Sequence, residues 1–303
     1  IEKSLGAPSS FAIVYDRAAL VVLAQQEGLR VPQTAVITGH PDLEKWAAST
    51  GFPAVLKANA TSGGDGVRIV QTLEQAEHAL RALESPPFVA RALKRALIDQ
   101  DMALLWPALL RKRYVVNAQA FVSGREATST VACWRGRILA SLHFEVLHKQ
   151  DPRGPSTVLR LIENREMSAA TERLVRKLGL SGLHGFDFML EEPSGAPFLI
   201  EINPRATQVG HLPLGEGHDL PAALYAAVSG KDVQATARIT QNDTIALFPQ
   251  EWLRNPASTF ISSAYHDVPW EEPAFILACV RRGQGQNAWY SPQKWANAFS
   301  KDQ

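Results

Sequence analysis

The sequence predicts an α+β fold of two lobes, and three observations lead to this expectation. Strand and helix patterns alternate at first, as in βαβ units. From Tyr114 onward, apolar and polar residues alternate in runs, which is typical of an antiparallel sheet flanked by helices. A composition of 46% hydrophobic and 20% charged residues is that of an ordinary globular protein. We expect the boundary near residue 120: an N-terminal helical region (1–32) joining the large lobe, a small lobe (33–120) and a large lobe (121–303).

The N-terminal elements are marked by caps and breakers. Residues 16–28 form a predicted helix with Asp16 at the N-cap and Gly28 at its end. The capping-box pattern from Thr72 to Gln75 begins another helix, which runs to Leu83. The other expected elements are strands at 34–38, 53–59 and 67–70 and a helix at 42–49.

Residues 84–112 are harder to interpret. Pro86 and Pro87 break the chain, and arginines and lysines are then interspersed among leucines. This pattern fits an insertion that packs one apolar face and exposes the other. The alternative is a basic surface for a partner or an anionic substrate.

The second half contains mostly strands. A tight turn at Arg135-Gly136-Arg137 joins two of them, and a polar segment at 148–156 has the composition of a mobile loop. A helix at 168–178 has Ser168 as its expected N-cap and Gly179 at its end. The remaining expected elements are strands at 114–122, 126–134, 138–146 and 244–248, a helix at 219–229 and a short terminal helix.

An acidic hairpin at 186–203 carries the strongest chemical signal. Pairing its strands about Ser194, with Leu190 opposite Phe198, places Asp187 directly across from Glu201. Alternation then puts one set of side chains on the face of the two carboxylates and the rest in the core. The carboxylate face would hold Asp187, Met189, Leu199, Glu201 and Asn203, and the core face Phe186, Phe188, Leu190, Phe198, Ile200 and Ile202.

Two opposed carboxylates would lie roughly 5 Å apart and repel unless a cation binds between them. Magnesium, a hard cation that takes carboxylate and phosphate oxygens, fits this position, and Asn203 can add a carbonyl oxygen. The alternative is a solvated edge hairpin. Arg205, in the Asn203-Pro204-Arg205 ending, favours the cation, because its guanidinium fits phosphate.

A glycine-rich loop follows a strand lysine. Lys57 closes an apolar strand, and Gly63, Gly64 and Gly66 follow closely. Such a loop lets backbone N–H groups approach phosphates. It lacks the Gly-Lys-Ser/Thr of a Walker A motif and leads into a strand, unlike a dinucleotide-binding fingerprint. On its own, a plain hairpin turn is an equal alternative.

The bulk composition excludes several classes. A formal charge of +1 gives no reason to expect nucleic acid as a partner. The apolar stretches are shorter than the ~20 residues of a membrane span. Cys133 and Cys279, without CxxC spacing, are typical of a reducing cytoplasm. Because the chain opens on Ile1 with no initiator Met, we expect that an N-terminal segment precedes it.

Taken together, Lys57, the loop at 62–66 and the segment from Asp187 to Arg205 resemble the ATP-grasp superfamily over roughly residues 11–230. The Asn-Pro-Arg ending looks most like carbamoyl-phosphate synthetases and related carboxylate–amine ligases. The resemblance implies an ATP-grasp fold with ATP between two α+β lobes. It does not extend to residues 231–303.

The resemblance also implies roles for individual residues. Arg17 and Lys57 match two phosphate-binding lysines, and the glycine loop matches a flap over the phosphates. Gln119, Phe121 and Val122 lie in a segment that matches the interlobe hinge, where residue 119 and the backbone through Val122 would read the adenine edge. Glu126 would hold the ribose hydroxyls, and Met189 would lie under the adenine. Many members have Glu in place of Gln119.

The metal and the transferred phosphoryl group are assigned in the same way. Asp187, Glu201 and Asn203 match ligands of Mg²⁺, with Mn²⁺ as an alternative metal, and Arg205 matches an arginine beside the phosphoryl group. The residues expected to act in catalysis are therefore Arg205, Lys57 and Asn203. Two departures bear on the substrate: Gly210 stands where biotin carboxylase has a catalytic Glu, and Gly185 where D-alanine ligases have an Arg.

The expected activity is that of an ADP-forming ligase, in which ATP phosphorylates a carboxylate and an amine or other nucleophile displaces the phosphate. One alternative is carbamoyl-phosphate-synthetase-like phosphorylation of bicarbonate or carbamate. Another, of a different class, is a nucleotide-binding module without catalysis. The expected partners are small-molecule carboxylate and amine substrates in the cytoplasm, with neither nucleic acid nor membrane. A homodimer is one option for the assembly.

No nucleophilic side chain is required by this chemistry. We therefore interpret Ser123 and Ser156 as loop residues. His184 and His211 flank the site in sequence, and packing or capping roles are favoured over proton transfer or substrate contact. The polar loop carries further weak candidates for substrate contact, Lys149, Arg153 and Ser156.

Overall fold

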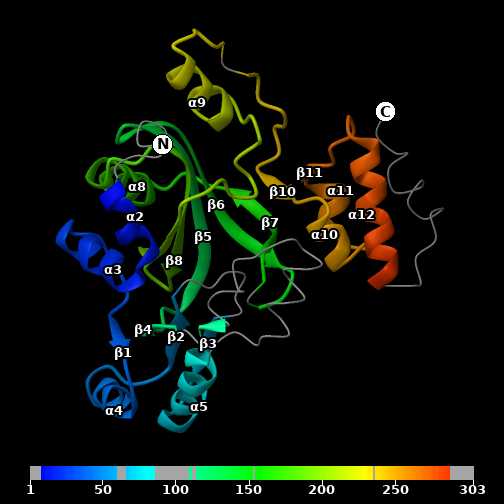
Figure 1. The fold of residues 1–303 in the computed structure, drawn as a ribbon. Coiled ribbons are helices and arrows are strands. Elements are labelled where there is room, and N and C mark those ends of the chain that lie inside the picture. Colours follow the sequence, from blue (N-terminus) through cyan, green and yellow to red (C-terminus); the bar gives the residue numbers. More distant parts are fainter. Residues whose placement is uncertain are drawn as a thin grey trace.

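Two sheets organise the structure. The computed structural model describes residues 8–59, 66–85, 109–110, 114–152, 154–234 and 236–286. A four-stranded sheet lies at one end of the molecule, and the long strands of a seven-stranded sheet extend away from it (Figure 1). Both sheets carry helices, as the α+β prediction required. No helix in the described ranges is long and apolar enough to cross a membrane.

The small sheet has the strand order β1-β4-β2-β3, and each neighbouring pair is antiparallel. Its strands are β1 (Thr34–Ile37), β2 (Ala54–Ala58), β3 (Val67–Val70) and β4 (Val116–Ala120). The expected βαβ unit is therefore modified: β1 and β2 run in the same direction, but β4 lies between them.

One face of the small sheet is covered by helices α4 (His40–Ser49) and α5 (Leu73–Glu84). The core beneath them includes Leu43, Trp46, Leu56, Leu80 and Ala118. Because side chains alternate along a strand, the neighbours of Leu56 and Ala118 lie on the other face of the sheet. This second face presents Lys57, Asn117 and Gln119, all of which are buried.

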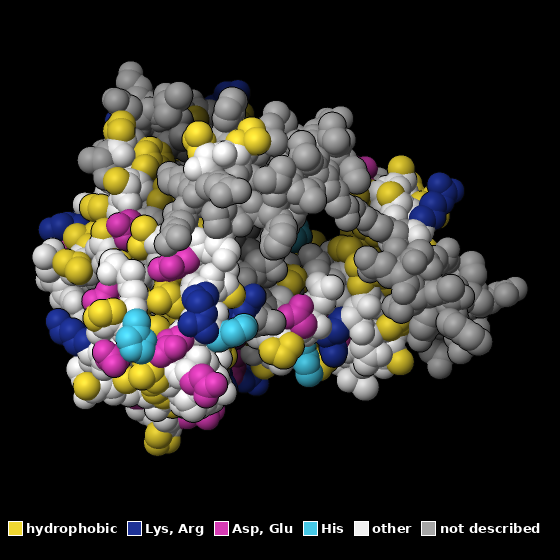
Figure 2. All heavy atoms as spheres, turned by 60° about the horizontal axis from the view of Figure 1, so that its bottom comes forward, with side chains coloured by type: hydrophobic (Ala, Val, Ile, Leu, Met, Phe, Trp, Pro, Cys, Tyr) yellow, Lys and Arg dark blue, Asp and Glu magenta, His cyan; other side chains and the backbone are white. Residues whose placement is uncertain are grey.

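Figure 2 views the molecule from the side of the small sheet. On this face, Lys and Arg side chains are interspersed with Asp and Glu and with apolar residues. The described residues form no concentrated basic surface there.

The large sheet has the strand order β11-β10-β7-β6-β5-β8-β9, and only its β10–β11 pair is parallel. Its strands are β5 (Gly124–Trp134), β6 (Arg137–Lys149), β7 (Ser156–Leu161), β8 (Gly182–Glu191), β9 (Pro197–Asn203), β10 (Thr244–Ala246) and β11 (Tyr265–His266). The expected loop at 148–156 is shorter than predicted, because β6 extends to Lys149 and β7 begins at Ser156. β7 itself was not predicted.

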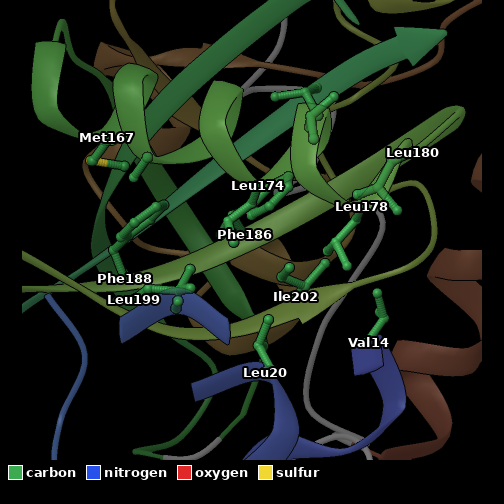
Figure 3. Packing of buried hydrophobic residues seen from close by; sticks show 14 of the residues in the cluster. Val14, Leu20, Met167, Leu174, Leu178, Leu180, Phe186, Phe188, Leu199 and Ile202 are labelled. Atoms are coloured by element: carbon green, nitrogen blue, oxygen red, sulfur yellow. The ribbon is translucent and has the colours of Figure 1, made fainter. Parts of the chain in front are cut away.

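Helices cover both faces of the large sheet. On one face, α2 (Pro8–Tyr15), α3 (Arg17–Gln26) and α8 (Arg165–Leu178) enclose a core that includes Leu20, Leu174 and Phe186 (Figure 3). On the other face, α9 (Leu220–Ser229) and the segment before it cover a second core. The C-terminal helices are α10 (Gln250–Arg254), α11 (Phe260–Ser263) and α12 (Pro273–Gln286).

Helix caps were predicted well where a short polar side chain directly precedes an apolar run. Asp16, Thr72 and Asp219 each accept a hydrogen bond from the first turn of their helix. The predicted cap of α8 is wrong: Asn164, not Ser168, accepts from the N–H groups of Glu166 and Met167.

The hairpin β8–β9 contains a bulge that the sequence pattern does not reveal. Asp187 pairs with Glu201 as predicted, but Phe188 pairs with Leu199, and Leu190 pairs with Pro197 instead of Phe198. Ile200 is the extra residue in β9. The predicted faces of Leu199, Phe198 and Ile200 are therefore wrong: Leu199 is 2% exposed in the core beside Phe188, as Figure 3 shows, while Phe198 and Ile200 are only half-buried.

The insertion at 84–112 lies almost entirely outside the described residues. Its described apolar residues Leu109 and Leu110 are exposed.

Candidate functional site

The carboxylates of Asp187 and Glu201 are brought together by the hairpin, and neighbouring side chains hold Asp187 in place. The hydroxyl of Thr128 donates to Asp187 Oδ1 (3.0 Å), and the amide of Asn203 donates to Oδ2 (2.8 Å). Thr128 lies directly across from Asp187 on β5. Side chains from three adjacent strands thus build this part of the site.

The electrostatics of the pair favour a cation. Burial and the neighbouring Glu201 carboxylate raise the pKa of Asp187 to about 6, and the hydrogen bonds from Thr128 and Asn203 only partly offset this. Two carboxylates and an amide oxygen suit a hard divalent ion. Among the described residues no group of three or more His, Cys, Asp or Glu side chains could hold a metal. A magnesium ion held by this set would take its remaining ligands from phosphate and water.

Arg17 connects this carboxylate pair with the small sheet. It is the first residue of α3, directly after the N-cap Asp16. Its Nη2 lies 3.2 Å from Glu201 Oε2, and its Nη1 donates to the backbone carbonyl of Ala58 in β2. The guanidinium is thus placed between the two sheets, beside the carboxylate of Glu201.

Lys57 lies next to the end of β2, on the face of the small sheet that α4 and α5 do not cover, and is 7% exposed. Burial lowers the pKa of Lys57 to about 8, although the carboxylates of Glu201 and Asp187 act to raise it. Both carboxylates are therefore within electrostatic range of this ammonium, even though they belong to the other sheet.

Of the predicted flap, only Gly66 is described. It is buried, and its carbonyl accepts a hydrogen bond from the N–H of Ala58, one residue after Lys57. Gly63 and Gly64 lie outside the described residues.

The predicted hinge residues lie at the end of β4 (Gln119) and in the link from β4 to β5 (Phe121 and Val122). Gln119 is 5% exposed, and its amide donates to Thr34 Oγ1 (3.3 Å). Phe121 is 41% exposed, and Val122 is half-buried. At Gly124 a Cβ would lie 2.0 Å from the carbonyl oxygen of Leu190, so only glycine fits where the link joins the large sheet.

Glu126 and Met189 lie opposite each other on β5 and β8. Glu126 pairs with Lys149 Nζ (2.8 Å), which also donates to the carbonyl of Pro152 (2.8 Å). Met189 is half-buried and pairs with Phe198 on β9.

Arg205 is exposed, and its Nη1 lies 3.3 Å from the carbonyl of the next residue, Ala206. The structure places it two residues after Asn203 and records no contact between its side chain and the carboxylates. Of the weaker candidates, Ser123 is exposed on the link, Ser156 begins β7, and Arg153 lies outside the described residues.

The two histidines differ in position. His184 is 4% exposed and interacts through Nε2 with the carbonyl of Ser181 (3.1 Å), and burial lowers its pKa, so it is a packing residue. His211 is exposed, and its Nε2 lies 3.5 Å from Asp267 Oδ2.

Three residues that sequence reasoning missed belong to the site. Thr128 binds Asp187, and its position depends on the pairing of β5 with β8, for which the sequence has no local signal. Asn117, across from Lys57, is 1% exposed and donates to Asn59 Oδ1 (2.9 Å). Because of the bulge, Phe198 pairs with Met189 and lies on the same face of the sheet.

Two family models match adjoining parts of the chain. One, described as the carbamoyl-phosphate synthase L chain ATP binding domain, matches residues 16–105, and the ATP-grasp domain matches residues 108–209. The carbamoyl phosphate synthase large chain of Kineococcus radiotolerans is 23% identical over 250 residues, which is 80% of this chain and 21% of that protein. The chain thus spans about a fifth of the length of this relative.

Solved structures share the fold. The biotin carboxylase domain of Hydrogenobacter thermophilus 2-oxoglutarate carboxylase superposes with a TM-score of 0.55 at 15% identity, over 76% of this chain and 48% of that one. N5-carboxyaminoimidazole ribonucleotide synthetase of Thermus thermophilus gives 0.55 at 19% identity, over 77% and 57%. The two family matches and the shared structures show that the chain has the ATP-grasp fold.

Proposed function

We propose that this protein binds Mg-ATP between its two lobes and transfers the γ-phosphoryl group to a substrate carboxylate, as an ADP-forming ligase. The observation that carries the proposal is the meeting of opposite charges at one place: the opposed carboxylates of Asp187 and Glu201 lie against Arg17 and near Lys57. Carboxylates for a metal beside cations for phosphates are what a metal–nucleotide site needs.

Asp187, Glu201 and Asn203 would hold magnesium, with manganese as the alternative. The bound metal would neutralise charge on the β- and γ-phosphates. Arg17 and Lys57 would hold the phosphates, and Gly63, Gly64 and Gly66 would cover them. Gln119, Phe121, Val122 and Met189 would surround the adenine, and Glu126 would bind the ribose after leaving Lys149.

The chain's own residues would position the reactants. Lys57 and Arg17 keep the triphosphate extended, so that a carboxylate oxygen can attack the γ-phosphorus in line while ADP leaves. Arg205 and Asn203 would compensate the charge on the transferred group. The products of this step are ADP and an acyl phosphate. An amine then attacks the acyl carbon, phosphate leaves, and the amine loses a proton to solvent.

A second candidate is phosphorylation of bicarbonate or carbamate. The Hydrogenobacter thermophilus structure was solved with MgADP and bicarbonate, and the Kineococcus radiotolerans relative is a carbamoyl phosphate synthase large chain. These names support bicarbonate as an acceptor to test. A nucleotide-binding module without catalysis is the least favoured alternative, because the carboxylates and both cations are all present.

The proposed division of the chain is a helical region (1–32) joining the large lobe, a small lobe (33–120) and a large lobe (121–303). We further propose that the substrates are small carboxylates and amines, that the protein acts in the cytoplasm, and that its assembly is a homodimer. We also propose that nucleic acid is not a partner, because the formal charge is only +1.

The test is a screen for ADP release with amino acids, hydroxy acids and bicarbonate, each with and without amines. At least one acceptor should stimulate ADP release. Lys57→Ala should lower the stimulated rate by on the order of 100-fold, because a charge that acts on the transferred group is lost. Lys177→Ala is the matched control, since Lys177 is exposed on α8 and pairs with Glu27. Mg-nucleotide binding without release for any acceptor would favour the binding-module alternative.

A further inference from the structure

The segment after Asn203 crosses the large sheet close to the metal carboxylates. A Cβ at Gly185 would lie 2.3 Å from Thr207 Cγ2, so the segment packs directly on β8. At Gly210 a Cβ would lie 3.5 Å from Thr130 Oγ1 on β5. Gly185 and Thr130 are a cross-strand pair, two residues along from the pair of Asp187 and Thr128. On one face of a sheet this step is about 7 Å.

Buried neighbours hold His211 in place within this segment. Gly210 and Leu212 on either side are buried, and Val209, Leu212 and Leu214 belong to the second core of the large sheet. The side chain of His211 is 59% exposed. The backbone is thus anchored, and the imidazole remains accessible.

The imidazole of His211 has two hydrogen-bond acceptors beside it, one from Asp267 and one from the Gln208 backbone. Nε2 is 3.5 Å from Asp267 Oδ2, and the ring also bonds to the backbone of Gln208. Asp267 has a 6% exposed side chain and accepts a hydrogen bond from the N–H of Phe248, so it is fixed at the edge of β10 and β11. Asp267 and the Gln208 backbone raise the pKa of His211, which favours the cationic ring.

Two buried hydroxyls lie at this segment, one within it (Thr207) and one beneath it on β5 (Thr130). Thr130 Oγ1 and Thr207 Oγ1 have no hydrogen-bond partner among the described residues, and Thr130 is fully buried. A buried hydroxyl without a partner is costly, so these oxygens are suited to a ligand that accepts or donates a hydrogen bond. They are an observation independent of the histidine.

We propose that the cationic ring of His211, held by Asp267, binds the carboxylate of the acceptor in place of its bond to the Gln208 backbone, with the hydroxyl of Thr207 as a second donor. The inference rests on the proposed function, which it extends by naming the residue that receives the acceptor. An anionic acceptor must approach a site that already contains Asp187, Glu201, Glu126 and the phosphates. A fixed cation on the next segment of backbone offsets that repulsion.

The experiment uses the whole chain, saturated with magnesium and the non-hydrolysable analogue AMPPNP at neutral pH. Bicarbonate, acetate, glycine and aspartate are titrated in turn while NMR records the histidine ring signals. The His211 signal is assigned by its loss in His211→Gln. At least one carboxylate should shift this signal saturably. His218, an exposed histidine on the same connection that interacts with the carbonyl of Ser141, is the internal control and should not shift.

The variants separate binding of the acceptor from binding of the nucleotide. His211→Gln should weaken carboxylate binding by about tenfold or more, because a charge-assisted hydrogen bond is lost. His211→Lys, which keeps a cation, should restore part of it, and Asp267→Asn should give a smaller loss. AMPPNP affinity should stay within about twofold in all three. His218→Gln is the matched control.

Thr207→Val is a second test, because it should not lower the thermal stability of the empty protein but should weaken carboxylate binding. Removing a hydroxyl that has no partner should leave the empty protein as stable or slightly more stable in thermal unfolding. Carboxylate binding should nevertheless weaken. If Mg-AMPPNP binds but no carboxylate shifts His211, or His211→Gln binds carboxylates like wild type, the inference is wrong. Failure of Mg-AMPPNP itself to bind would overturn the proposed function and this inference with it.

Discussion

The protonation state of Lys57 depends on the groups that lie beside it. It is a buried ammonium whose pKa burial has lowered to about 8, beside carboxylates that only partly compensate. Phosphates placed next to it would favour the charged form and raise this pKa again. Nucleotide binding and protonation of Lys57 should therefore be linked.

The linkage predicts a pH dependence of affinity. Below a pH of about 8 the empty site already holds the charged lysine, so AMPPNP affinity should be constant there. As pH rises through 8, the empty site loses its proton, and affinity should fall by up to about tenfold per pH unit until the pKa of the bound state is reached. Calorimetric titrations between about pH 7 and 10 measure this profile.

Lys57→Met is the control for that profile. It should bind more weakly and show no such fall, because Arg17 stays charged over the whole range. An equally steep fall in Lys57→Met would show that another group titrates.

At the residue scale, the sequence predicted residue positions best where a local rule applied. Pairing the strands about Ser194 predicted the pair of Asp187 and Glu201, which the structure confirms, although the predicted register between the bulge and the turn is wrong. Thr128 and Asn117 could not be found in this way. Their positions depend on how distant strands pair, and pairing across 59 residues between Thr128 and Asp187 has no local signature.

At the scale of elements, the bulge in β9 decides which side chains reach the site. With Ile200 as the extra residue, Pro197 and Leu199 turn into the core, and Phe198 pairs with Met189 on the other side. Bulges re-aim side chains next to functional sites in many sheets. Here the bulge supplies a second large apolar side chain beside the one expected under the adenine.

The bulge predicts a contrast between two neighbouring truncations. Leu199→Ala should destabilise the protein by about 2–5 kcal/mol, because it opens a cavity in a packed core. Phe198→Ala should cost less stability and should weaken AMPPNP binding. Urea unfolding and calorimetry measure the two quantities. The regular register would give the reverse result, with Phe198→Ala the more destabilising change.

Elements with strong local signals were predicted, and those defined by tertiary pairing were not. Asp16 and Asp219 mark helix starts because short polar side chains satisfy free N–H groups wherever they occur. The short strands β7 and β11 lack such marks. β7 lies between β6 and β10 in the sheet, and β11 pairs with β10, so pairing within the sheet sets their positions.

At the scale of the whole molecule, the site exists only because two lobes meet. Arg17 binds Glu201 of the large sheet and the Ala58 carbonyl of the small sheet at the same time. Its helix packs in the core of the large sheet through Leu20 and Leu23. The guanidinium therefore links lobes that otherwise carry separate cores.

Arg17→Met should loosen this link. Amides at the end of β2 should exchange hydrogen faster in the empty protein, and AMPPNP affinity should fall. Arg17→Lys should keep part of the affinity but not the protection, because an ammonium cannot bridge both partners as a guanidinium does. Hydrogen-exchange mass spectrometry gives the first quantity. Arg173→Met, which removes a contact with the Glu27 carbonyl within the large lobe, should leave β2 unchanged.

The most direct test of the central claim is a calorimetric titration of AMPPNP with and without magnesium, in wild type and in the double variant Asp187→Asn/Glu201→Gln. We predict that wild type binds one nucleotide per chain and binds it about tenfold or more tightly with magnesium. The double variant should lose this magnesium effect. Equal magnesium enhancement in both proteins, or no nucleotide binding in wild type, would contradict the assignment of this hairpin as the metal end of an ATP site.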